Sequence, residues 1–147
     1  MQSLKRYGKQ TEKQCMENTT QCSNDKKKFR IVKTLKIPVY GCTLQFVITD
    51  HLIDEVNRIY KKYDIPELFT DYAEGCLISS DIDLYIVIFD DKYLSHNTLS
   101  HEVFHAVIKI TEDRGIEDDE QQAWLCGWIT EHLYKFLAKK NLTVKNG

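Results

Sequence analysis

The sequence lacks the long apolar runs and paired cysteines that are typical of membrane, secreted and disulfide-bonded proteins. No stretch approaches the ~20 consecutive apolar residues of a membrane-spanning helix, and the first residues contain no apolar segment of the kind found in secretory signals. The five cysteines form no Cys-x-x-Cys pair, and an odd, scattered set argues against a disulfide framework. We therefore expect a protein that is kept in the cytoplasm.

The chain also lacks a large net charge. Its 147 residues carry a formal charge of −2 at pH 7, which by itself implies neither a nucleic acid nor a membrane as partner. The charge is uneven, because residues 1–30 hold eight Lys or Arg against three Asp or Glu. We interpret residues 1–28 as a flexible basic leader. Nucleic-acid binding by this leader is a less favoured alternative.

Hydrophobic residues make up 42% of the chain, which is typical of a globular protein. The periodicity predicts an α+β domain over residues 29–140, followed by a short tail at 141–147. We expect a small mixed or antiparallel sheet packed on helices, with two strands within 29–49, a helix over 52–63, strands over 72–79 and 84–89, and helices over 99–110 and 116–138. The unbroken apolar run 84–89 predicts burial on both faces, although at a sheet edge it would be able to pair with an extended substrate.

The pentapeptide His101-Glu102-Val103-Phe104-His105 carries the chemistry of the sequence. On a helix, residues four apart share a face, so both imidazoles point the same way and suit one tetrahedral Zn²⁺ ion. Glu102 lies at the edge of that face, where it can act as general base toward a water molecule. Asn97 or Thr98 is the expected N-terminal cap of this helix. The simplest alternative to a metal site is a helix with two surface histidines.

A catalytic zinc site takes three protein ligands, and the last predicted helix is the source we expect for the third. Glu120 falls on one stripe with Trp124, Gly127, Trp128 and Glu131. We take Gly127 as a sign that the motif helix approaches closely there, which would bring Glu120 level with the histidines. Asp119 is the first alternative ligand, followed by His132 and Cys126. We expect both tryptophans to pack in the core.

The segment 100–128 resembles the gluzincin class of HExxH zinc metallopeptidases. More narrowly, His-Glu-Val-Phe-His-Ala with Asp-Glu-Gln-Gln-Ala-Trp-Leu-Cys-Gly-Trp is similar to small metallopeptidase-like proteins encoded by phages and prophages. The resemblance implies a minimal zincin-like core and a Zn²⁺ cofactor. It also implies His101, His105 and Glu120 as metal ligands, Glu102 as catalytic base, and a peptide or protein as substrate. A phage relationship would also allow association with a virion.

Three functions follow from these features. The first is a zinc-dependent peptidase, in which Glu102 passes a proton from water to the leaving amine. The second is a non-catalytic, zinc-stabilised structural or interaction protein, and the third is a metal-free domain whose leader binds a partner. A peptidase also needs a group that stabilises the oxyanion. The sequence offers four unranked candidates for that group: Tyr93, His96, His132 and Tyr134.

Overall fold

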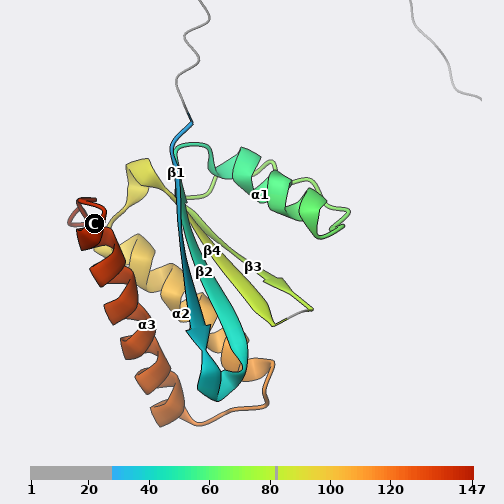
Figure 1. Ribbon diagram of the computed structural model, residues 1–147, viewed down its shortest axis with the longest axis vertical. Coiled ribbons are helices and arrows are strands. Elements are labelled where there is room, and N and C mark those ends of the chain that lie inside the picture. Colours follow the sequence, from blue (N-terminus) through green and yellow to red (C-terminus); the bar gives the residue numbers. More distant parts are fainter. Residues whose placement is uncertain (1–27, 82) are drawn as a thin grey trace, which may run out of the picture.

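The computed structural model describes residues 28–81 and 83–147, which form one mixed sheet with helices on both faces (Figure 1). This arrangement confirms the predicted α+β class. The elements follow the chain as β1 (Arg30–Ile37), β2 (Cys42–Thr49), α1 (Leu52–Lys62), β3 (Gly75–Ser80), β4 (Leu84–Asp90), α2 (His96–Glu112) and α3 (Asp119–Lys139), with short 3-10 turns at Pro38–Tyr40 and Asp91–Tyr93. The predicted leader, residues 1–28, lies outside the described part of the chain except for Lys28.

The sheet has the strand order β1-β2-β4-β3. β2 runs parallel to β4, whereas β1–β2 and β3–β4 are antiparallel pairs. β4 is therefore an interior strand, and the prediction that its apolar run is buried on both faces is confirmed, because residues 84–89 are all buried. The edge strands of the described sheet are β1 and β3, so β4 has no free edge for an extended substrate.

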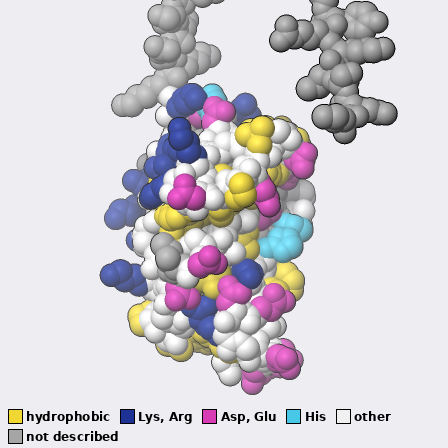
Figure 2. Space-filling model, turned by 90° about the vertical axis from the view of Figure 1, so that its right-hand side faces the viewer, with side chains coloured by type: hydrophobic (Ala, Val, Ile, Leu, Met, Phe, Trp, Pro, Cys, Tyr) yellow, Lys and Arg dark blue, Asp and Glu magenta, His cyan; other side chains and the backbone are white. Residues whose placement is uncertain are grey.

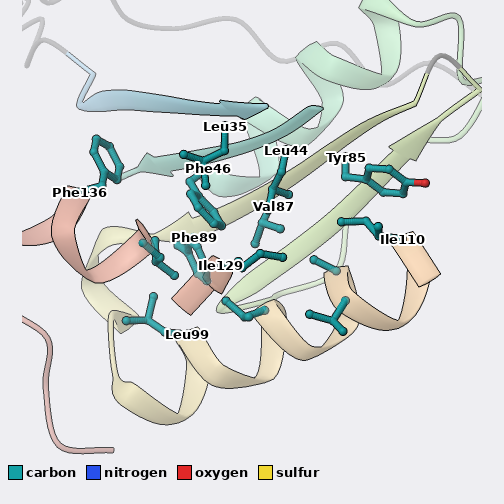
Figure 3. Packing of buried hydrophobic residues seen from close by; sticks show 14 of the residues in the cluster. Leu35, Leu44, Phe46, Tyr85, Val87, Phe89, Leu99, Ile110, Ile129 and Phe136 are labelled. Carbon is teal, nitrogen blue, oxygen red and sulfur yellow. The ribbon is translucent and has the colours of Figure 1, made fainter. Parts of the chain in front are cut away.

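Two apolar layers cover the two faces of the sheet. α1 packs on one face, where Val56 and Ile59 meet Val47 and Ile88. α2 and α3 cover the other face, and Figure 3 shows side chains of the sheet pointing toward these two helices. The core on that side joins strand residues to helix residues, among them Leu44, Phe46, Phe89, Leu99, Ile110, Ile129 and Leu133. None of the helices in the described residues is long and apolar enough to cross a membrane.

α2 begins one turn earlier than its apolar stripe predicts. Ser95 caps the helix, because its Oγ accepts a hydrogen bond from the backbone N–H of Thr98 (3.1 Å). The expected caps Asn97 and Thr98 lie inside the helix instead. The first turn of α2 is polar, so the apolar periodicity that located the helix did not detect it. The segment 141–147 runs beside this end of α2, where the Lys145 N–H donates to the Leu94 carbonyl (2.8 Å).

The other end of α2 is tied to the sheet through a buried tyrosine. The Tyr85 hydroxyl donates to Asp113 Oδ2 (2.7 Å) and accepts from Arg114 Nη1 (2.8 Å). Burial raises the pKa of Tyr85 to about 12; the hydrogen bond to Asp113 adds to this rise, whereas Arg114 opposes it. Tyr85 therefore keeps its proton at neutral pH and fixes the end of the helix to β4.

Glu55 links α1 to the edge strand β1. It is 5% exposed and accepts hydrogen bonds from Arg30 Nε (3.0 Å) and from two nitrogens of Arg58 (2.7 and 3.1 Å). Desolvation raises the pKa of this carboxyl, but the hydrogen bonds from Arg58 and Arg30 outweigh it and bring the pKa below its usual value of 4.5. The charged form is thus favoured in the folded state.

We expect Glu55→Gln to lower the free energy of unfolding by about 1–3 kcal/mol at pH 7, because charge-assisted bonds to a buried group are lost. A lowered carboxyl pKa contributes stability above the unfolded pKa, and this is lost as pH falls through the folded pKa. The difference between wild type and variant should therefore be constant above about pH 5.5 and shrink below 4.5. Urea unfolding across this range measures it, with Glu67→Gln as the exposed control.

Candidate metal and base site

His101 and His105 lie on the solvent-facing side of α2. Both side chains are exposed, and their Nε2 atoms are 2.9 Å apart. The two rings are nearly perpendicular, with an interplanar angle of 78° and centroids 4.5 Å apart. The spacing of four residues therefore has the predicted effect, because both imidazoles direct one nitrogen toward the same point.

Glu102 turns from that side of the helix toward the sheet. It is only 8% exposed, and it lies against Gly75 at the start of β3. A Cβ atom at position 75 would lie 2.6 Å from Glu102 Cγ and 2.9 Å from Cδ, so the glycine makes room for the carboxylate. Desolvation raises the pKa of Glu102, and the neighbouring His101 and His105 partly offset the rise.

The structure does not bring Glu120 to the histidine pair. Glu120 is exposed in the first turn of α3, and two residues later the Gln122 amide donates to Thr111 Oγ1 (3.3 Å). Thr111 follows His101 by ten residues, which is about 15 Å along a helix. Because α2 and α3 are joined by a short loop, the start of α3 meets the end of α2. The expectation that Glu120 lies level with the histidines is therefore wrong.

The side of α2 that meets α3 also differs from the side that carries the pair. α3 contacts α2 at His96, whose Nδ1 lies 2.5 Å from the Tyr134 hydroxyl, and at Thr111. At about 100° per residue, His101 and His105 lie roughly 130° around the helix from these contacts. Within residues 28–81 and 83–147, no three His, Cys, Asp or Glu side chains form a group able to hold a metal ion.

The alternative third ligands are no closer to completing such a group. Asp119 is exposed beside Glu120, and Cys126 is partly buried against the core. His132 packs on Trp128, with ring centroids 4.0 Å apart and its Nδ1 2.8 Å from the Trp128 carbonyl oxygen.

The residues that share a stripe with Glu120 do not all have the surroundings that the sequence predicted. Nothing lies within 4 Å of a Cβ built at Gly127, so this glycine is not a point of close helix approach. Trp124 is 55% exposed, which contradicts its expected place in the core, whereas Trp128 is partly buried against it.

A cavity of about 290 Å³ lies beside the pair, lined by Glu74, Gly75, Asn97, Thr98, His101 and Glu102. Glu74 and Gly75 belong to no sequence motif and approach α2 only through the sheet, so no pattern in the sequence pointed to them. None of the four oxyanion candidates lines this cavity. Tyr93 instead packs against Tyr72, with ring centroids 5.5 Å apart.

We expect Gly75→Ala to lower the free energy of unfolding by about 1–3 kcal/mol, because its Cβ would overlap Glu102. The loss should be smaller when Glu102→Ala removes the overlapped atoms, which a double-mutant cycle by urea unfolding measures. Gly127→Ala is the matched control. That site is open, so alanine should stabilise the helix by up to about 1 kcal/mol. If Gly75→Ala lowers the free energy of unfolding equally with and without Glu102→Ala, the contact between residues 75 and 102 is contradicted.

Comparison of the chain with protein-family models, with curated proteins and with solved structures finds no match in any of the three. What this site does is therefore inferred from its own residues and geometry.

Proposed function

We propose that the protein is a zinc-dependent, metallopeptidase-like hydrolase in which His101 and His105 hold the ion and Glu102 is the general base. The observation that supports this most is the meeting of two imidazole nitrogens 2.9 Å apart beside a buried carboxylate. In this proposal Glu120 is not a ligand, because of its distance along the helix pair.

The histidine pair supplies two of the three protein ligands that a catalytic zinc ion takes, and the described residues bring no third His, Cys, Asp or Glu to it. Two nitrogens bound at 2.0–2.1 Å to one tetrahedral ion lie about 3.3 Å apart. The observed separation of 2.9 Å differs from this by a few tenths of an ångström, which small ring rotations supply. Both rings are exposed, whereas structural zinc sites are closed by four protein ligands. The openness favours a catalytic role over the structural alternative.

A bound zinc ion would supply Lewis-acid chemistry, lowering the pKa of a water molecule and polarising a carbonyl group. Glu102 would take the proton of that water and pass it to the leaving amine. Its burial suits this task, because a carboxylate with a raised pKa is a stronger base at neutral pH. The positive charge of an ion held by His101 and His105 would favour the ionised form of Glu102, which a general base needs.

β3 supports an extended peptide as the substrate. It is an edge strand of the described sheet, and an extended chain can pair with such an edge through main-chain hydrogen bonds. Gly75 opens this strand directly against Glu102. A peptide bound along β3 would therefore pass close to the proposed base. This assignment replaces the strand over 84–89 as the place where substrate would pair.

We expect Glu102→Gln to lower peptide hydrolysis by at least about 100-fold, which is the usual contribution of a general base. Its zinc content should stay equal to that of wild type, because glutamine leaves both imidazoles in place. Hydrolysis of a fluorogenic peptide library and metal analysis of the purified full-length protein measure these quantities. Glu112→Gln, at an exposed position on the same helix, is the matched control.

His101→Ala separates this proposal from its alternatives. It should remove most of the bound zinc, whereas His51→Ala, at an exposed histidine before α1, should not. Zinc binding without peptide hydrolysis in wild type, and no effect of Glu102→Gln, would favour the zinc-stabilised structural role. Unchanged zinc content in His101→Ala would exclude both zinc-dependent functions.

A further inference from the structure

The cavity beside the histidine pair has an acidic lining. The proposed hydrolysis uses only one of its carboxylates, that of Glu102. Glu74 and Glu102 are both part of its wall, and no Lys or Arg lines it. Figure 2 views the molecule from the side on which β3 forms the sheet edge. Asp and Glu side chains are spread over this face, whereas most Lys and Arg gather along its left margin.

Glu102 gives the cavity a buried carboxylate without a partner. Its side chain is 8% exposed, and among the described residues none donates a hydrogen bond to it or forms an ion pair with it. Its carboxylate oxygens are not fully enclosed, because within the described ranges Asp91 Oδ1 is the fully buried side-chain oxygen without a partner. They can therefore meet a donor or a positive charge that comes from outside the protein. The cavity is where such a group can enter, because Glu102 is otherwise enclosed by the helix and by Gly75.

Glu74 holds a second carboxylate at the cavity. Its Oε2 accepts a hydrogen bond from the Thr98 hydroxyl (2.8 Å), which fixes the side chain against the first turn of α2. Thr98 is buried, whereas Glu74 is exposed, so one hydrogen bond holds this carboxylate at a place that a ligand can reach. Glu74 has no ion-pair partner within the described ranges, and its charge is free to meet a ligand.

We infer that this cavity binds a cationic group of the substrate, an ammonium or guanidinium, and that Glu74 is the residue that selects for it. That this preference selects a substrate for hydrolysis rests on the proposed function. The binding of a cationic group in the cavity does not depend on it. A cation of this kind comes either from a free peptide N-terminus or from a Lys or Arg side chain. An anionic group would meet two carboxylates and be repelled.

Four peptides of equal length test the inference and separate the two sources of charge. Each carries lysine or its neutral analogue norleucine at one position, with a free or an acetylated N-terminus. Binding is measured by calorimetry on full-length protein after removal of metal by a chelator, with folding checked by circular dichroism. We expect at least one of the two charges to tighten binding about five- to tenfold.

Glu74→Gln should abolish that preference, because glutamine keeps an oxygen for the Thr98 hydroxyl but loses the charge. Glu74→Lys should reverse it, so that peptides with a glutamate in place of lysine bind more tightly. Glu67→Gln, an exposed acid outside the cavity, is the matched control and should behave as wild type.

Equal affinity of wild type for all four peptides would overturn the inference, as would a preference that survives Glu74→Gln. Loss of zinc in Glu74→Gln would also overturn it, because Glu74 would then act as a metal ligand. Cation selectivity that depends on Glu74 in a protein without peptidase activity would uphold the inference while the proposed function failed. Peptide hydrolysis without cation selectivity would overturn the inference while the proposed function held.

Discussion

The packing of α2 against the sheet is the constraint on which the candidate site depends. Leu99, Val103 and Ile110 are buried against the strands, and this apolar stripe fixes the rotation of the helix about its axis. With that rotation set, His101 and His105 must face solvent, and Glu102 must turn toward β3. The separate environments of the imidazoles and of the carboxylate thus follow from one hydrophobic interface.

Both ends of this helix are held, so the site stands on a rigid support. Ser95 and the segment around Lys145 secure the start, while Tyr85 and Arg114 secure the end. Fixed ends matter for any chemistry here, because ligands and bases act only when held close to a productive geometry. The two Nε2 atoms already lie 2.9 Å apart, so binding one ion would need little reordering of the rings.

The sequence predicted what is local and failed where several elements must meet. Strand and helix positions follow from apolar periodicity, and the histidine pair follows from helical spacing alone. The position of Glu120 depends on how α3 returns along α2, and a short connection forces an antiparallel register that no pattern within α3 reveals. Glu74 and Gly75 were missed for a related reason. They lie far from the motif in sequence and reach it only because β3 pairs at the edge beside β4.

The two sheet edges differ in a way that bears on the proposed substrate. β1 carries Arg30, Lys33 and Lys36, and charged residues on an edge strand oppose pairing with another chain. β3 has the sequence Gly-Cys-Leu-Ile-Ser-Ser, without a charge, so it lacks this protection. Because β3 is short and begins against Glu102, an unprotected edge here is better explained as a place for a bound segment than as a defect. Glu74 directly precedes the strand and Asp81 directly follows it, so both charges flank β3, where they can act on a bound chain without blocking the pairing.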